Sequence, residues 1–275
     1  MRKRLLGSVA FVSLAMMGAA NAATHHPKPP PAPPPPVDPW SGFYIGANVG
    51  YSWGRSNTTA SLYNATTGAL LSSSSSSFAM PGALGGAQIG YNQLANGTWL
   101  WGLETDFQAA NERGSANNRF MCAVAVCQAG NPFFATGGLP QNPVVVSTFN
   151  ERIDWFGTVR GRVGTLVTPS IVAYATGGLA YGEIKTSGTI TGQTGTGAVT
   201  AASFSSDTTK AGWTLGCGLE GRISAQWSAK IEYLYMDFGR VNATGGLPTN
   251  FIPIAAVFNS RITDNVVRVG LNYKY

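Results

Sequence analysis

The clearest pattern in the chain lies in the stretch WSGFYIGANVGYSWG, which runs from Trp40 to Gly54. One register of alternate residues is apolar and has aromatic ends: Phe43, Ile45, Ala47, Val49, Tyr51 and Trp53. The other register is Tyr44 followed by glycine and small polar residues. A period of two predicts a β-strand with one apolar face.

Seven more segments show a similar alternation, so the pattern predicts eight strands. The predicted strands are 42–54, 82–92, 98–109, 148–163, 171–183, 210–223, 227–238 and 261–275. Only in 171–183 is the alternation ambiguous. There we expect the apolar register to face outward, with Ala173, Ala175, Leu179 and Tyr181.

The connections between these strands alternate in length. Those after the second, fourth and sixth strands are short, at 93–97, 164–170 and 224–226. The others are long and polar, at 55–81, 110–147, 184–209 and 239–260. This alternation predicts up-and-down hairpins with all long loops at one end. A membrane barrel has such an arrangement, with short periplasmic turns and long external loops.

Aromatic residues gather near the ends of the predicted strands. One set falls at the expected periplasmic rim: Phe43, Tyr91, Trp99, Trp227, Tyr273 and Tyr275. The other falls nearer the outer rim: Trp53, Phe107, Trp155, Trp213 and Tyr235. We interpret them as the two aromatic girdles of a membrane protein. A soluble β-sandwich is the alternative, but its core gives no reason for this segregation. The predicted fold is therefore all-β, an eight-stranded antiparallel up-and-down transmembrane β-barrel.

Composition agrees with this interpretation. Charged residues make up 11% of the 275 residues, and 35 residues are glycine, whereas a soluble domain carries about 25% charged residues. After the N-terminal segment, no run approaches the ~18 apolar residues of a membrane-spanning helix.

The N-terminus has the features of an export signal. Basic residues 2–4 precede an apolar run at 5–17 and an A-x-A site at 20–22, which predicts a signal peptide at 1–22, cleaved between Ala22 and Ala23. Cleavage would leave 15 basic against 12 acidic residues, a net charge of +3, so we expect no nucleic-acid partner. Residues 23–40 contain a proline-rich tract that we expect to be a periplasmic spacer before the barrel at 41–275. A plain linker is the expected role, with a reach toward the peptidoglycan cell wall or a partner as the alternative.

Charges of both signs fall in the inward register of the predicted barrel. The set is Glu104, Asp106, Arg152, Asp154, Arg160, Arg162, Glu220, Arg222, Lys230, Glu232 and Arg268. A buried charge is costly unless it is paired, and eight strands leave only enough room for side chains. We therefore expect an ion-pair network that fills the lumen. A selectivity or proton path is the alternative.

No pattern of catalytic residues accompanies the barrel. The two histidines, His25 and His26, precede the proline-rich tract, so neither can orient a nucleophile at the barrel rim. We expect no enzymatic activity, no metal site and no cofactor. Cys122 and Cys127 are close in sequence in an exported chain and form a candidate disulfide, and Cys217 is expected to be a small wall residue.

Several motifs together resemble the Omp25/Omp31-type outer-membrane proteins of alphaproteobacteria, also called porin-family or outer-membrane immunogenic proteins. They are the opening stretch at 40–54, WFGTVRGRVG at 155–164, YATGGLAYG at 174–182, KIEYLYMDFG at 230–239 and the terminal VVRVGLNYKY. The resemblance implies a surface-exposed barrel of a Gram-negative outer membrane. It also implies that Tyr273 and Tyr275 belong to the C-terminal signal read by the outer-membrane assembly machinery.

The resemblance also bears on function, because family members are linked to haem binding, envelope integrity and modest pore activity. We expect a structural and surface-interaction role, with a small low-conductance diffusion channel as the alternative. The expected partners are outer-membrane lipid and lipopolysaccharide, with haem or host surface molecules as further candidates. The segment 120–134 is the most apolar of the predicted loops, and we expect it to carry any ligand or host contact.

Overall fold

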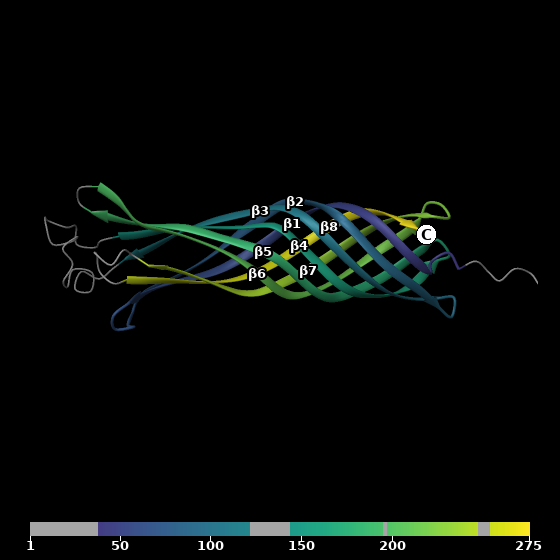
Figure 1. Cartoon of the computed structure of the whole chain (residues 1–275), viewed down its shortest axis with the longest axis horizontal. Coiled ribbons are helices and arrows are strands. Elements are labelled where there is room, and N and C mark those ends of the chain that lie inside the picture. Colours follow the sequence, from purple (N-terminus) through teal and green to yellow (C-terminus); the bar gives the residue numbers. More distant parts are fainter. Residues whose placement is uncertain (1–37, 122–143, 195–196, 247–253) are drawn as a thin grey trace, which may run out of the picture. The chain divides into compact units, whose positions relative to one another are not determined.

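The computed structural model describes residues 38–121, 144–194, 197–246 and 254–275 (Figure 1). They form eight strands in one closed antiparallel barrel, in which each strand pairs with the next and β1 pairs with β8. The strands are β1 (Gly42–Asn64), β2 (Leu70–Ala95), β3 (Trp99–Met121), β4 (Val144–Thr168), β5 (Ile171–Thr194), β6 (Gly197–Arg222), β7 (Trp227–Gly246) and β8 (Ile254–Lys274). The predicted fold class is confirmed. None of the described residues forms a helix long and apolar enough to cross a membrane.

The two faces of each strand differ as the period of two predicts. On β1, Phe43 and Val49 are each 63% exposed, whereas Tyr44 is 3% exposed. On β5, Ala173, Ala175, Leu179 and Tyr181 alternate with more deeply buried neighbours, so the ambiguous segment faces outward as predicted. The outward face is apolar, so it suits lipid, and the inward face fills the lumen.

Both aromatic sets lie on the outer wall. At the end with the short turns, the Phe43 and Tyr91 ring centroids are 4.8 Å apart and those of Trp227 and Tyr273 are 5.2 Å apart. At the other end, the ring centroids of Trp213 and Tyr235 are 5.4 Å apart. The β2–β3 turn is tight, with positive φ at Asn96 (52°) and Gly97 (67°), as a two-residue hairpin requires.

The strands are much longer than the sequence predicts. The segment 55–81, expected to be a loop, is a hairpin whose strands β1 and β2 are paired from Gly42 to Tyr63. The other three long connections are also largely strand. The prediction ended the strands too early because apolar alternation stops at the outer girdle, and beyond it serine and threonine occupy many positions.

Beyond the outer girdle, the barrel divides into two sheets. The β2–β3 ladder stops at Leu84 and Ala110, and the β6–β7 ladder stops at Trp213 and Asp237. The other six ladders continue outward, which leaves one sheet of β7, β8, β1 and β2 and another of β3 to β6. An apolar cluster lies in this outer part, where Phe258 stacks on Phe204 at 4.8 Å and on Phe149 at 5.2 Å. The divided outer end therefore has its own core.

Candidate functional site

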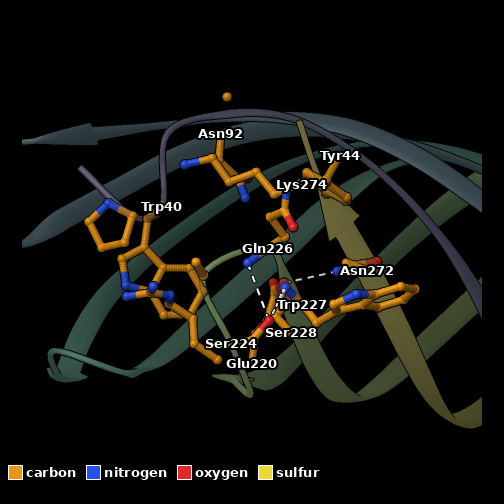
Figure 2. A pocket seen from close by; sticks show the side chains of 14 residues that line it. Trp40, Tyr44, Asn92, Glu220, Ser224, Gln226, Trp227, Ser228, Asn272 and Lys274 are labelled. Carbon is orange, nitrogen blue, oxygen red and sulfur yellow. Dashed lines mark hydrogen bonds between the residues drawn. The ribbon is translucent and has the colours of Figure 1, made fainter. Parts of the chain in front are cut away.

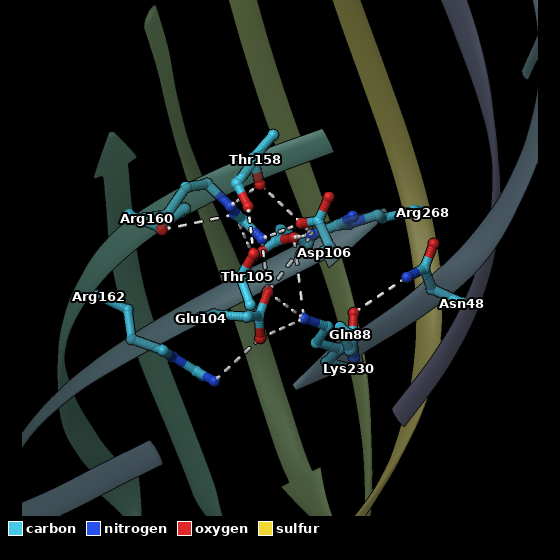
Figure 3. Close-up of polar contacts among 12 residues, drawn as sticks. Asn48, Gln88, Glu104, Thr105, Asp106, Thr158, Arg160, Arg162, Lys230 and Arg268 are labelled. Atoms are coloured by element: carbon cyan, nitrogen blue, oxygen red, sulfur yellow. Dashed lines mark hydrogen bonds and ion pairs between the residues drawn. The ribbon is translucent and has the colours of Figure 1, made fainter. Parts of the chain in front are cut away.

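A network of eight buried charges crosses the lumen, and Figure 3 shows the part of it around Glu104 and Asp106. It has four acids and four bases: Glu104, Asp106, Glu220, Glu232, Arg160, Arg162, Lys230 and Arg268. Their side chains are at most 4% exposed. The four positive and four negative formal charges therefore cancel within the lumen.

Arg160 and Arg268 join the acids of opposite strands. Arg160 on β4 lies 3.0 Å from Asp106 Oδ2 and 3.0 Å from Glu232 Oε1. Arg268 on β8 lies 2.9 Å from the same Asp106 oxygen and 2.6 Å from Glu232 Oε2. Lys230 Nζ donates to both oxygens of Glu104 at 2.8 Å. Because the contacts cross from β3 and β4 to β7 and β8, the network closes the lumen rather than lining it.

Two tyrosines complete the network on its periplasmic side. The Arg162 guanidinium carbon lies 3.9 Å from the centroid of the Tyr174 ring, a cation–π contact. Arg162 also donates to Glu220 at 2.7 Å and to the Tyr44 hydroxyl at 3.1 Å. Tyr44 in turn donates to Glu104 at 2.7 Å. With Tyr44 on β1 and Tyr174 on β5, the network has members on seven of the eight strands.

Glycines in the inward register leave room for these rings. A Cβ at Gly218 would lie 2.6 Å from the Tyr174 hydroxyl oxygen, and one at Gly90 would overlap the Tyr44 hydroxyl. Neither side chain has space to move away in a packed lumen. In the opening stretch, a Cβ at Gly50 would lie 2.7 Å from Arg268 Cβ, so close packing inside a narrow barrel also explains its glycine-rich register.

The structure corrects the predicted position of Asp154. This residue and Arg152 lie on the outer wall, where Asp154 forms ion pairs with Arg152 at 2.8 Å and with Lys185 at 3.0 Å. A β-bulge between Ile153 and Trp155 shifts the alternation by one residue, which turns the side chains to the other face. Arg222 does face inward, but it lines the periplasmic mouth and forms no ion pair with any described residue.

Three further inward acids were missed by the sequence analysis: Glu112, Glu151 and Asp264. Each is at most 1% exposed, and none has an ion pair within the described part of the chain. A Cβ at Gly54 would lie 3.4 Å from Asp264 Oδ1 and 3.4 Å from Glu112 Oε2, so these two carboxylates are close neighbours. Asp264 lies within the predicted strand 261–275 and in the same register as Arg268, so the alternation already places it in the lumen.

Glu151 lies beyond the outer girdle, in the divided part of the barrel. Burial raises the pKa of its carboxyl group, and the nearby hydroxyls of Ser56 and Ser260 only partly oppose this effect. Neither carboxylate oxygen has a hydrogen bond of good geometry among the described residues. Glu151 is therefore a buried acid whose pKa lies above that of an exposed carboxyl group.

Apolar layers lie on both sides of the charge network. Toward the periplasm, Trp40, Leu100, Val172 and Tyr174 form one cluster. Toward the outside, a larger cluster fills the lumen with Met80, Leu84, Ile153, Phe156, Ala180, Ile184, Leu234, Met236, Phe238, Val241, Ile262 and Val266. The cavity at the periplasmic mouth, shown in Figure 2, has a volume of only about 20 Å³. This is enough for about one water molecule.

Several predicted features fall outside the described residues: the signal cleavage site at Ala22 and Ala23, the two histidines, and the pair Cys122 and Cys127. These stay predictions. Tyr273 and Tyr275 lie at the end of β8, where the Tyr275 amide donates to the Phe43 carbonyl at 3.1 Å. Cys217 is a free, exposed residue of the lipid-facing wall. Within the described ranges, no group of three or more His, Cys, Asp or Glu residues is placed to hold a metal ion.

Comparison with known proteins gives the family. Residues 9–274 match the model of the outer membrane protein beta-barrel domain. The chain is 36% identical over 276 residues to the 31 kDa outer-membrane immunogenic protein of Brucella melitensis, with all of both chains covered. It is 26% identical over 125 residues to the 22 kDa outer membrane protein of Rhizobium leguminosarum, covering 46% of this chain and 49% of that protein.

Among solved structures, the chain is similar to OprG from Pseudomonas aeruginosa, with a TM-score of 0.47 and 13% identity. The match covers 86% of this chain and 97% of that one. The match to the 31 kDa protein covers the whole chain and the family model covers residues 9–274, and both agree with the closed eight-stranded barrel. The chain therefore belongs to the outer membrane protein β-barrel family, and its strands cross the outer membrane of a Gram-negative bacterium.

Proposed function

We propose that the protein is a closed barrel that stabilises the outer membrane and presents its external end to the surroundings, and that it is neither a channel nor an enzyme. The observation that carries this proposal is the filled lumen. An ion that entered it would have to separate Arg160 and Arg268 from Asp106 and Glu232, all of which are buried. Breaking one partner from a buried ion pair costs about 3–5 kcal/mol.

The apolar layers support the same proposal. A hydrated ion that passed the charge network would next meet a layer that includes Phe156, Leu234 and Phe238. These side chains offer nothing to replace its water shell. The barrel interior thus resembles a protein core, which suits a stabilising role in the membrane.

A low-conductance channel is the alternative function. Glu112 and Asp264 favour it, because their carboxylates face the lumen without a basic partner among the described residues. Conduction would then require the network to rearrange. An enzymatic role has less support, since the four acids of the network are held by bases and the two histidines lie outside the described barrel.

The external end is the proposed contact surface. The resemblance to outer-membrane immunogenic proteins and the apolar character of 120–134 support contact with haem or a host surface molecule through this segment. Most of the segment lies outside the described residues, so the proposal rests on its sequence.

A strain that lacks the protein separates the two functions. If the barrel stabilises the envelope, the strain becomes sensitive to detergent, and both the wild type and a variant with 120–134 replaced by a Gly-Ser linker restore resistance. The linker variant should lose any haem or host-cell binding that the wild type shows. A strain with normal detergent resistance but slower uptake of small hydrophilic solutes would instead support the channel.

A further inference from the structure

The charges on the outer wall are confined to particular heights. Between the two girdles, every described charged side chain points into the lumen or lines its periplasmic mouth. Just beyond the outer girdle, basic residues appear on the outward face of six strands: Arg55, Arg113, Arg152, Lys185, Arg240 and Arg261. The wall therefore changes from apolar to charged at one level, where bases outnumber acids among the described residues.

One group of these residues carries excess positive charge. Arg240 on β7 and Arg261 on β8 are directly opposite each other, and Arg55 lies on the next strand, β1, two residues from the partner of Arg261. Among the described residues, the acid beside them is Asp237, whose Oδ2 lies 2.7 Å from Arg261 Nη2. Three guanidinium groups and one carboxylate leave two positive charges.

The basic residues on the opposite wall are more nearly balanced. There, Arg152 and Lys185 pair with Asp154, and Lys185 also lies 3.3 Å from Glu183. Arg55 and Arg240, in contrast, are exposed and have no ion pair within the described residues. Like charges directly across a strand pair are destabilising, so the pair of Arg240 and Arg261 favours an external anion.

The height of this group matches that of lipid headgroups. Arg55 follows Trp53 of the outer girdle by two residues, and Arg261 lies four residues beyond Asn265, which pairs with Tyr235. At about 3.4 Å per residue and a tilt of about 40°, the three guanidinium groups stand roughly 5–10 Å above the girdle. Aromatic girdles mark the headgroup level of a membrane, and anionic headgroups attract basic residues there.

We propose that Arg55, Arg240 and Arg261 form a binding site for the phosphate groups of an anionic glycolipid in the outer leaflet, the lipid portion of lipopolysaccharide. Guanidinium groups bind phosphate in bidentate geometry. The lipid-facing residues Tyr51 and Trp53 continue down the same strand, with ring centroids 6.3 Å apart, so acyl chains can pack directly below. The site rests on the assignment of the divided end of the barrel to the outside, and it does not depend on whether the lumen is closed.

The test uses the full chain, refolded in a neutral detergent and titrated with bisphosphorylated lipid A in native mass spectrometry. Arg55→Gln/Arg240→Gln should weaken binding at least about tenfold, which corresponds to about 1.4 kcal/mol. Arg261 is left in place so that Asp237 keeps its partner. The matched control is Arg113→Gln/Arg119→Gln, which removes two exposed charges from the other wall and should change binding less than about twofold. Heat-shifted gel mobility verifies folding of each variant.

Two further probes distinguish the source of the phosphate. Lipid A without phosphate groups should bind the wild type as weakly as phosphorylated lipid A binds the double variant. Inorganic phosphate at the same concentration should show no binding. The proposal is overturned if both double variants lose affinity equally, if the dephosphorylated lipid binds as well as the phosphorylated one, or if inorganic phosphate alone occupies the site. None of these results would change the conductance that tests the proposed function.

Discussion

The residues that decide the character of this barrel are the eight buried charges of its lumen. Each acid has at least one base within 3.0 Å, and aromatic rings and hydroxyls fill the remaining space. Removing a single member leaves an uncompensated charge in a buried site, whereas neutralising both members of a pair does not. The network is thus stabilising only as a whole.

Arg162 and Glu220 provide a test of this rule. Arg162→Met should lower the free energy of unfolding by about 3–5 kcal/mol, because Glu220 loses its guanidinium partner. The double variant Arg162→Met/Glu220→Gln should recover most of that loss. Unfolding by urea in lipid vesicles measures both values.

The control for these two variants is Arg222→Met, which removes another inward-facing arginine, at the periplasmic mouth. It should change stability by less than about 1 kcal/mol, since Arg222 has no ion pair within the described residues. Equal losses for Arg162→Met and the double variant would show that the charges do not act as a pair.

The raised pKa of Glu151 predicts that the free energy of unfolding depends on pH. Burial raises its pKa in the folded state, so the unfolded chain loses this proton first as the pH rises. The free energy of unfolding therefore falls above the ordinary carboxyl pKa and continues to fall until the folded state also ionises. Glu151→Gln should remove the part of that fall that Glu151 causes, so it should be more stable than the wild type at pH 7, by about 1 kcal/mol, and equal to it near pH 4.

The control for the pH dependence is Glu183→Gln, which removes a half-buried acid of the outer wall on the neighbouring strand β5. Its effect should stay below about 0.5 kcal/mol at both pH values. A Glu151→Gln variant that keeps the pH dependence of the wild type would show that this acid is not the group responsible.

The sequence predicts individual residues well where the alternation is unbroken. Glu104 and Arg268 lie in the lumen because an uninterrupted period of two connects them with apolar outward neighbours. Asp154 was predicted to face the lumen but lies on the outer wall, because a bulge follows Ile153. The sequence gives no strong signal of this bulge. Glu112 was missed because it lies where the outward face is no longer apolar. Glu151 was missed because it precedes the same bulge, so the prediction placed it on the outward face.

At the scale of elements, the strands have two parts with different physical requirements. The inner part faces lipid, so apolar alternation predicts its ends at the girdles. The outer part stands in water and is stabilised by pairing and by the cluster that contains Phe149 and Phe258. Polar strands of this kind resemble loops in composition, which explains why the sequence predicts the barrel but not the length of its strands.

The segment before β1 closes the periplasmic end. Trp40 is 4% exposed, packs with Leu100, Val172 and Tyr174, and donates to the Pro169 carbonyl at 3.2 Å. Asp38 fixes the approach of the chain, since Oδ1 accepts the amides of Trp40 at 2.9 Å and Ser41 at 3.1 Å. One residue at the barrel entrance thus joins the first strand to the β4–β5 turn.

Trp40→Ala should therefore lower the free energy of unfolding by about 3–5 kcal/mol, the usual cost of removing a buried large aromatic ring. Trp40→Phe keeps a ring in place and loses the hydrogen bond, so it should cost only about 1 kcal/mol from that bond plus a small packing loss. Urea unfolding in vesicles provides the comparison. A Trp40→Ala variant as stable as the wild type would mean that the periplasmic cluster does not contribute to the barrel.

At the scale of the whole molecule, the layers follow one another along the barrel axis. An apolar layer at the periplasmic end, a neutral charge network and a second apolar layer fill the lumen between the girdles. The outer wall is apolar over the same height and charged just above it. Closure of the sheet removes its edges inside the membrane, and the described side chains fill the interior between the girdles. On the proposed function, the functional surfaces are the outer wall and the external end.

The most direct test of this account is the single-channel conductance of the full protein, refolded and reconstituted in a planar lipid bilayer. Folding of the same sample is verified by its heat-shifted gel mobility. The account predicts silence, with no discrete current steps from the folded protein. Reproducible steps whose ion selectivity changes on charge reversal at Arg160 or Glu104 would contradict it and would make the lumen a channel.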